Sequence, residues 1–297
     1  MTSIGIIGII GIGAMGRAMA ENLLQRDVEL AVYNRTPSRL ADLKERGVVV
    51  ERSSAGVVQH ANCTLMCVAD DAAVRDVIFG PAMTADVLRD KHIVDLSSIS
   101  VSLARECYAR CKSIGGSYLD APVSGGVEGA REGTLSIMVG GDKAAFDRVQ
   151  PVLAWLGNNV TWLGAAGNGA LAKQINQIVV ASYLAGLGEA FALAVRLGMD
   201  LQTLRSAIGG GYAQSRVLDA KFPNYVADRY EPGGRASLHK KDLNNALAVA
   251  EEHGLRPPLT KVLRDLFVEA EALGYGHLDH SVLYRVLHEK MQDQGGN

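Results

Sequence analysis

The chain has 297 residues, of which 48% are hydrophobic and 21% charged, and its formal net charge is −2. This length accommodates two domains with a large buried core. Without an excess of basic residues, binding to nucleic acid or to an anionic membrane is not expected. The cysteines form two i,i+4 pairs, Cys63/Cys67 and Cys107/Cys111, and lack the tighter spacing of metal sites. We therefore expect a cytoplasmic protein with reduced cysteines and no metal.

Short β-branched runs alternate with amphipathic stretches up to about Gly164. This alternation predicts an α/β fold in which residues 1–164 form a Rossmann-type, doubly wound parallel sheet. The predicted strands are Ile4–Ile10, Glu29–Tyr33, Val48–Val50, Cys63–Val68, His92–Asp95, Tyr118–Asp120, Leu135–Val139 and Val160–Trp162. The last strands could run differently, because Gly133–Gly141 is also compatible with part of a hairpin.

The second half of the chain changes character. Ala165–Gly198 contains no proline and many alanines, which predicts one long central helix of roughly 30 residues. Further helical stretches follow it, so residues 165–297 are predicted to be an all-helical domain for substrate binding and dimerisation. Within the long helix, Ser182, Gly186 and Ala190 form a face of small side chains, which fits either ordinary close packing or a dimer interface. Glu189 interrupts the apolar stretch, so a membrane span is not expected.

The most informative motif is Gly11-Ile12-Gly13-Ala14-Met15-Gly16, which follows the first predicted strand and opens a helix. This order of strand, glycine turn and helix binds a dinucleotide pyrophosphate. Gly11 permits the tight turn, Gly13 lets the backbone approach the phosphates, and Gly16 lets helix and strand pack closely. The free N–H groups at the helix start favour the anion.

The second predicted strand ends in Asn34-Arg35-Thr36. A site that prefers NAD usually carries an acidic residue here, which binds the ribose hydroxyls. Asn34 does not repel a 2′-phosphate, and Arg35 and Thr36 can bind one. The triplet therefore predicts NADP(H) as the cofactor, with NAD(H) still possible.

Two later segments carry residues suited to chemistry. In Asp120–Gly126, Ser124 precedes Gly125 and Gly126, a pattern that fits either an anion-binding loop for a carboxylate substrate or a plain turn. Lys173 comes early in the long helix among small and apolar residues, with Asn176 on the same face. With few carboxylates nearby, a lowered pKa would suit Lys173 to proton transfer, although a solvated lysine is the alternative. The seven histidines show no metal-ligand spacing.

Together these motifs resemble the β-hydroxyacid dehydrogenase family, which includes 3-hydroxyisobutyrate dehydrogenase and tartronate semialdehyde reductase. The resemblance runs from Ile4 to about Glu289 and rests on GIGAMG, DAPVSGG with the later GTLSIMVGG, GNGALAKQIN and HKKDL. The segments HKKDLNNAL and Asp279-His280-Ser281 are most similar to the tartronate semialdehyde reductase branch.

The resemblance implies a role for each matching residue. Lys173 matches the catalytic lysine that donates a proton to the substrate carbonyl, and Asn176 matches an asparagine that orients the substrate. The other implied contacts are Ser124, Gly125, Gly126 and Asp242 for the substrate, and Gly11, Gly13, Ala14, Met15, Gly16, Asn34, Arg35, Thr36, Val68, Ala69, Ser98 and Lys241 for the cofactor. This chain departs from some members in lacking a proline after the fourth strand and in placing Gln177, rather than asparagine, four residues after the lysine.

The expected function is therefore an NADP-dependent oxidoreductase that interconverts a small β-hydroxyacid and its semialdehyde, with 2-hydroxy-3-oxopropionate as the expected substrate. A 3-hydroxyisobutyrate or other short β-hydroxyacid dehydrogenase is the alternative enzyme. A non-catalytic, dinucleotide-bound dimerisation module is the alternative of another class. An imine reductase is disfavoured because that group commonly replaces the lysine found here as Lys173. The expected partners are a small carboxylate-bearing aldehyde or hydroxyacid and further copies of the chain, as a homodimer or homotetramer.

Overall fold

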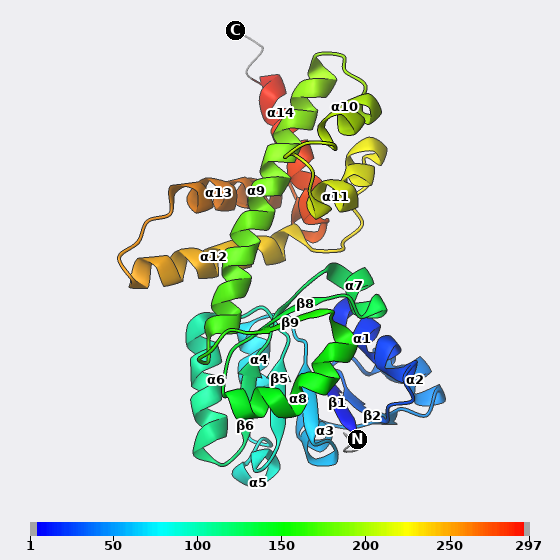
Figure 1. Ribbon diagram of the computed structural model, residues 1–297, viewed down its shortest axis with the longest axis vertical. Helices are drawn as coiled ribbons and strands as arrows, with labels where there is room; N and C mark the ends of the chain where they lie inside the picture. Colours follow the sequence, from blue (N-terminus) through cyan, green and yellow to red (C-terminus); the bar gives the residue numbers. More distant parts are fainter. Residues whose placement is uncertain (1–4, 294–297) are drawn as a thin grey trace. The chain divides into compact units, whose positions relative to one another are not determined.

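The computed structural model describes residues 5–293 and divides into two compact units, Met1–Lys173 and Gln174–Asn297 (Figure 1). The division falls inside helix α9 (Asn168–Arg196), whereas the sequence places the domain boundary at residue 164, just before that helix. Each unit has its own hydrophobic core.

The first unit is built on a six-stranded sheet in the order β3-β2-β1-β4-β5-β6, in which every neighbouring pair is parallel. Its strands are β1 (Ile7–Ile10), β2 (Leu30–Tyr33), β3 (Val49–Val50), β4 (Cys63–Met66), β5 (His92–Asp95) and β6 (Ser117–Asp120). The order reverses direction at β1 and β4, which is the switch point of a doubly wound sheet. The predicted Rossmann-type fold is confirmed.

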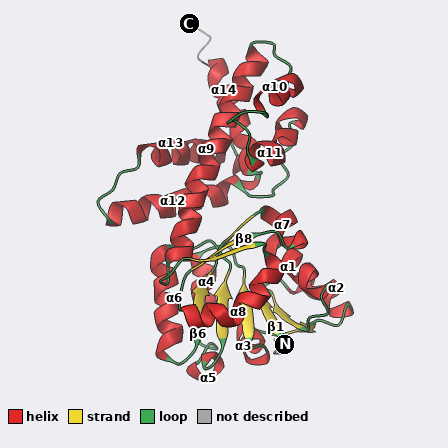
Figure 2. Ribbon diagram, in the orientation of Figure 1, coloured by secondary structure: helices red, strands yellow, loops and turns green. Residues whose placement is uncertain are grey.

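Helices surround this sheet, as the red ribbons around the yellow strands show (Figure 2). They are α1 (Ala14–Leu24), α2 (Ala41–Glu45), α3 (Ser54–His60), α4 (Asp71–Ile78), α5 (Ala85–Leu88), α6 (Val101–Ser113), α7 (Gly126–Glu132) and α8 (Lys143–Leu156), with a 3-10 turn η1 (Pro37–Leu40). Because helices cover the sheet, its central strands are buried and apolar, with Ile7, Ile9, Val32, Leu65 and Val94 in the core.

The last strands of the first unit form a separate three-stranded sheet, β7 (Val123–Ser124), β8 (Ser136–Val139) and β9 (Asn159–Trp162). Strand β7 pairs antiparallel with β8, and β9 pairs parallel with β8. The predicted strands near Leu135 and Val160 therefore do not extend the main sheet. Strand β7 was not predicted, because a valine followed by a serine makes no apolar run, whereas the equally short β3 lies in a run of valines.

The second unit is helical. It contains most of α9 together with α10 (Leu201–Ile208), α11 (Arg216–Ala227), α12 (Ala236–Glu252), α13 (Pro258–Ala272) and α14 (Leu283–Asp293), and the 3-10 turns η2 (Tyr275–His277) and η3 (His280–Val282). Helix α9 is long and apolar enough to cross a membrane, with a mean hydropathy of 1.9 in its most apolar window. Ala181, Leu184 and Phe191 of this helix, however, are fully buried in the core of the unit.

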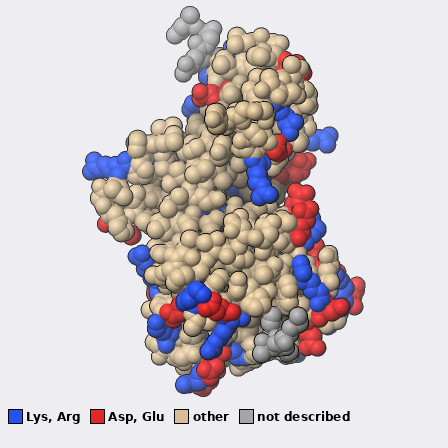
Figure 3. Space-filling view, viewed as in Figure 1, with Lys and Arg blue, Asp and Glu red and all other residues tan. Residues whose placement is uncertain are grey.

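The surface carries charges of both signs, and the cysteines are unpaired, as expected from the sequence. On the face drawn in Figure 3, the side chains of Lys and Arg are interspersed with those of Asp and Glu. None of the four cysteines forms a disulfide, and Cys63, Cys107 and Cys111 are buried. Burial raises the pKa of the Cys63 thiol to about 12, so this group stays protonated at neutral pH.

Candidate active site

The glycine turn between β1 and α1 has the geometry of a phosphate-binding loop. Gly11 has a φ of +97°, and a Cβ on it would lie 2.2 Å from the Cys67 carbonyl oxygen. A Cβ on Gly16 would lie 2.0 Å from the Gly11 carbonyl oxygen, so both glycines are required for close packing. A Cβ on Gly13 would meet nothing within 4 Å, and no side chain caps α1 at this residue. The backbone N–H groups at the start of α1 are therefore not covered by a side chain at Gly13, as binding of a dinucleotide pyrophosphate requires.

The three residues after β2 lie next to this turn. The Asn34 Oδ1 atom accepts a hydrogen bond from the Ile12 N–H at 3.0 Å, and its Nδ2 atom donates to the Thr36 carbonyl at 2.9 Å. Asn34 thus holds its loop against the glycine turn, a contact that the sequence pattern did not reveal. Arg35 and Thr36 are exposed, and Arg35 makes no ion pair among the described residues. The pair remains a prediction for binding a 2′-phosphate.

The end of β4 is held by a chain of hydrogen bonds that starts at Asp95. The Asp95 carboxylate accepts from the Ser97 N–H at 2.9 Å and from the Tyr118 hydroxyl at 2.6 Å. The Ser97 hydroxyl accepts in turn from the Val68 N–H at 2.9 Å. Burial raises the pKa of Asp95 to about 6, against the lowering effect of the Ser97 and Tyr118 hydrogen bonds. Asp95 and Ser97 thereby fix the predicted cofactor-contact segment at Val68 and Ala69.

Lys173 and the predicted substrate loop meet in the first unit. The Lys173 Nζ atom donates to the Val123 carbonyl at 2.9 Å, directly before Ser124. Ser124 lies opposite Ser136 in the β7–β8 pair. Gly125 and Gly126 follow with φ values of +133° and +69°, in the region that favours glycine. The structure therefore places a half-buried ammonium group beside the loop predicted to hold a carboxylate.

In the second unit, the side chains of four polar residues form a chain of contacts, in which Gln177 lies between Asn176 and Asp242. The Asn176 Nδ2 atom donates to Gln177 Oε1 at 3.1 Å, and Gln177 Nε2 donates to the Asp242 carboxylate at 2.8 Å. The Lys241 ammonium is 3.4 Å from the other Asp242 oxygen. Asp242 is only 4% exposed, so these donors replace water around its charge. The glutamine that departs from the family pattern thus links Asn176 to Asp242.

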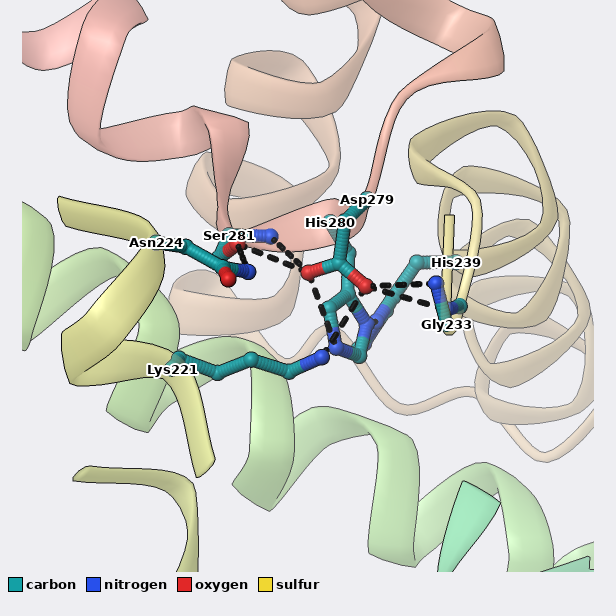
Figure 4. A network of polar contacts seen from close by, with 8 residues as sticks. Lys221, Asn224, Gly233, His239, Asp279, His280 and Ser281 are labelled. Carbon is teal, nitrogen blue, oxygen red and sulfur yellow. Dashed lines mark hydrogen bonds and ion pairs between the residues drawn. The ribbon is translucent and has the colours of Figure 1, made fainter. Parts of the chain in front are cut away.

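A further polar network starts at His239, one helical turn before Asp242 (Figure 4). The His239 Nε2 atom lies 2.9 Å from the Gln177 carbonyl oxygen, and the ring stacks on Phe267. The His239 Nδ1 atom lies 2.9 Å from His280 Nδ1. The network therefore fastens α12 to α9 on one side and to η3 on the other.

Asp279 is the buried anion of this network (Figure 4). Its carboxylate accepts from Lys221 at 2.9 Å, from the Gly233 and Gly234 N–H groups, and from Ser281. Burial alone would raise the pKa of Asp279, but the charges of His280 and Lys221 lower it well below its usual range. Asp279-His280-Ser281 entered the sequence analysis only through the family resemblance, and this network was not predicted from it. Within residues 5–293, no three His, Cys, Asp or Glu side chains gather as a possible metal site.

The doubly wound sheet and its glycine turn define a dinucleotide-binding protein. Residues 6–164 match the NAD binding domain of 6-phosphogluconate dehydrogenase, and residues 167–287 match the NAD-binding domain of NADP-dependent 3-hydroxyisobutyrate dehydrogenase. The chain therefore belongs to the 3-hydroxyisobutyrate dehydrogenase-like family of NAD(P)-dependent oxidoreductases, which act on CH–OH groups.

Individual relatives match over almost the whole chain. The chain is 41% identical to 2-hydroxy-3-oxopropionate reductase of Escherichia coli, over 95% of this chain and 96% of that protein. The solved structure of 3-hydroxyisobutyrate dehydrogenase of Mycobacterium tuberculosis with L-serine has a TM-score of 0.85 at 31% identity, over 96% of this chain and 99% of that one. The structure of Psf3 with NADP+ and 2-OPP has a TM-score of 0.86 at 26% identity, over 95% and 99%.

Proposed function

We propose that this protein is an NADPH-dependent reductase of 2-hydroxy-3-oxopropionate (tartronate semialdehyde), with Lys173 as the proton donor. The observation that carries the proposal is the Lys173 ammonium group, which donates to the Val123 carbonyl beside the Ser124 loop in the dinucleotide-binding unit. The substrate is inferred from the Escherichia coli relative of that name, which is 41% identical over nearly the full length of both chains.

When bound, the reduced nicotinamide supplies a hydride to the carbonyl carbon of the substrate. In the proposed reaction, Lys173 gives one of its ammonium protons to the carbonyl oxygen, so that a C–H and an O–H bond replace the C=O π bond. The lysine then regains a proton from solvent. General acids of this kind contribute about 10²–10⁴-fold in rate.

The remaining residues are assigned to binding. Ser124, Gly125 and Gly126 hold the substrate carboxylate, because their loop has a hydroxyl and no side chain at its two glycines. Asn176 and Asp242 orient the substrate, and Lys241 serves the nicotinamide end, as their match to the family pattern implies. Their hydrogen bonds through Gln177 support this assignment, because they fix the rotamers of Asn176 and Asp242.

The proposed preference for NADPH rests on the end of β2. No carboxylate stands there to bind the ribose hydroxyls, and Asn34 keeps the loop against the glycine turn. Arg35 and Thr36 are exposed and offer a cation and a hydroxyl to a 2′-phosphate. NAD(H) fits the same turn, with lower affinity.

Lys173→Ala tests the catalytic proposal. We expect it to lose most turnover while NADPH binding, measured by fluorescence titration, stays close to wild type. The assay is NADPH oxidation with a panel of short aldehyde acids, repeated with NADH. Wild-type turnover in the variant would refute the role of Lys173, and no turnover by the wild-type enzyme with any semialdehyde would refute the reductase.

A second candidate substrate is 3-hydroxyisobutyrate, which is supported by the likeness to the Mycobacterium tuberculosis enzyme at 31% identity. The two aldehyde substrates differ in a hydroxyl against a methyl group at C2, which an apolar pocket distinguishes by only about 10²-fold, so the substrate panel must contain 2-hydroxy-3-oxopropionate and the semialdehyde of 3-hydroxyisobutyrate. The higher kcat/KM decides between them. A protein that binds NADPH but turns over neither semialdehyde would be the non-catalytic dimerisation module.

We also propose that the protein is a cytoplasmic homodimer or homotetramer. The four unpaired thiols support a reducing compartment. Support for self-association comes from one exposed stripe of α9, where apolar and small residues recur at spacings of four and three. The stripe consists of Val179, Tyr183, Gly186, Ala190 and Leu193, and Leu197 continues it in the turn directly after the helix. This spacing is that of a helix that packs along a second helix.

A further inference from the structure

The Asp120 carboxylate holds the start of the helix that carries Lys173. Asp120 is the last residue of β6 and is 1% exposed. Its Oδ1 atom accepts from the Gly167 N–H and its Oδ2 atom from the Ala170 N–H, both at 2.8 Å. Because these donors lie at the N-terminus of α9, the carboxylate satisfies backbone groups that have no partner within the helix.

The backbone around Asp120 leaves no room for a shift. Asp120 and Gly140 exchange two backbone hydrogen bonds, of 3.2 and 2.8 Å. A Cβ on Gly169 would lie 2.2 Å from the Asp120 carbonyl oxygen, and one on Gly140 would lie 2.8 Å from its Oδ1 atom. The end of β6, the end of β8 and the start of α9 are therefore packed backbone to backbone, with the Asp120 side chain at their centre.

Two hydrogen bonds tie this part of the chain to α9 in register. Asp120 receives the Ala170 N–H, and three residues later on both segments Val123 receives the Lys173 Nζ–H. The first contact fixes the rotation and height of the first turn of α9. The second is made by the side chain one turn further along. A shift of the first turn would therefore move Lys173 away from Val123 and the Ser124 loop.

An ionised carboxylate suits this task. Each N–H···O bond to a charged oxygen is stronger than a neutral bond, and the positive end of the helix dipole favours an anion there. Burial raises the pKa of Asp120, and the N–H groups of Gly167 and Ala170 act against that shift. An uncharged side chain at this position would leave at least one buried donor unsatisfied.

We propose that Asp120 is a positioning residue for the reduction, which acts by setting the place of the Lys173 ammonium group over the Ser124 loop. The inference rests on the proposed function, because it assumes that Lys173 is the proton donor. It assigns Asp120 no contact with substrate or cofactor.

The test compares Asp120→Ala and Asp120→Asn with the wild-type enzyme. A misplaced catalytic group costs about 10²-fold, so we expect kcat to fall by that factor while the KM for the semialdehyde and the NADPH dissociation constant change little. The isotope effect with 4-deuterated NADPH should rise, because the chemical step becomes rate-limiting. Asp120→Asn keeps the side-chain volume and guards against a loss of folding in Asp120→Ala.

Asp200→Ala is the matched control. Asp200 likewise accepts an N–H at a helix start, from Thr203 at 2.7 Å, but it serves α10. Wild-type kcat in folded Asp120 variants, or a loss of folding in both, would overturn the inference. So would a loss of NADPH binding that accounts for the lost rate. Lys173→Ala, assayed in parallel, separates the two proposals. If this variant keeps the wild-type kcat, both the proposed function and the inference about Asp120 fail. If it loses kcat and the Asp120 variants keep theirs, only the inference about Asp120 fails.

Discussion

His239 and His280 face each other through their Nδ1 atoms at a distance of 2.9 Å. The His239 Nε2 atom lies 2.9 Å from the Gln177 carbonyl, which can only accept, so in the neutral ring Nε2 carries the proton. The His239 Nδ1 atom is then an acceptor, and His280 donates to it. One proton between the two rings thus joins η3 to α12, the helix of Lys241 and Asp242.

Replacing His280 by leucine tests this tie. The His280→Leu substitution removes both the donor to His239 Nδ1 and the charge that faces Asp279. We expect a loss of about 1–3 kcal/mol in the free energy of unfolding, measured in urea. His253→Leu is the control, because His253 is exposed and its ring contacts the Val249 carbonyl of its own helix turn. Equal stability of the two variants would contradict the tie.

The raised pKa of Asp95 predicts a pH dependence of stability. The folded protein binds this proton more tightly than the unfolded chain, because the pKa is about 6 in place of 3.8. The contribution of Asp95 to stability is therefore complete below pH 3.8 and is lost as the pH rises through about 6. The loss is on the order of 3 kcal/mol.

Asp95→Asn removes this dependence and retains both hydrogen bonds. The asparagine oxygen accepts from the Ser97 N–H, and its amide donates to the Tyr118 oxygen. We expect the variant to be at least as stable as the wild type at pH 7, with a flatter profile of unfolding free energy between pH 4 and 7. Asp147→Asn, on the exposed surface, controls for charge. Parallel profiles for wild type and Asp95→Asn would rule out the assigned pKa.

The sequence predicted the elements best where its pattern was long or apolar. The strand His92–Asp95 has the predicted bounds, and the predicted helix Ala165–Gly198 differs from α9 by three residues at its start and two at its end, because long apolar runs mark both elements clearly. Strand β7 had no such mark, since its two residues take extended form by pairing with β8.

The site was predictable residue by residue only where a motif existed. The glycine turn, Lys173 and the Ser124 loop each stand in a short pattern. The links that hold them do not: Val68 meets Ser97, and His239 meets His280, across 29 and 41 residues of chain. Such contacts depend on the packing of elements that local sequence does not encode.

Two glycines of the turn should respond differently to alanine. Gly13→Ala places a Cβ in open space, so we expect an unchanged melting temperature but NADPH binding weaker by about tenfold, or 1.4 kcal/mol. Gly16→Ala would push a Cβ to 2.0 Å from the Gly11 carbonyl oxygen and should cost about 1–3 kcal/mol in stability. Calorimetry measures the stability of both variants, and titration measures their affinity for NADPH. Wild-type affinity in Gly13→Ala would contradict the assignment of the pyrophosphate to this turn.

Arg35 should determine the choice of cofactor. Arg35→Ala removes the cation offered to the 2′-phosphate, so the KM for NADPH should rise about tenfold while the KM for NADH changes little. Arg46→Ala, also exposed but beyond α2, controls for the change in net charge. An enzyme that prefers NADH before mutation would contradict the role of Arg35 outright.

If two copies of the chain pack along the exposed stripe of α9, a charged side chain placed in the stripe should weaken their association. Val179 is 51% exposed in the single chain, so Val179→Glu leaves its fold intact. In a dimer, the same carboxylate would be desolvated without a partner, which costs several kcal/mol and shifts the equilibrium toward monomer. Light scattering after size exclusion measures the mass of the wild type and of the variant. Val49→Glu, a comparable apolar side chain at the edge strand β3, should leave the oligomer unchanged, and a Val179→Glu protein with the wild-type mass would place the interface elsewhere.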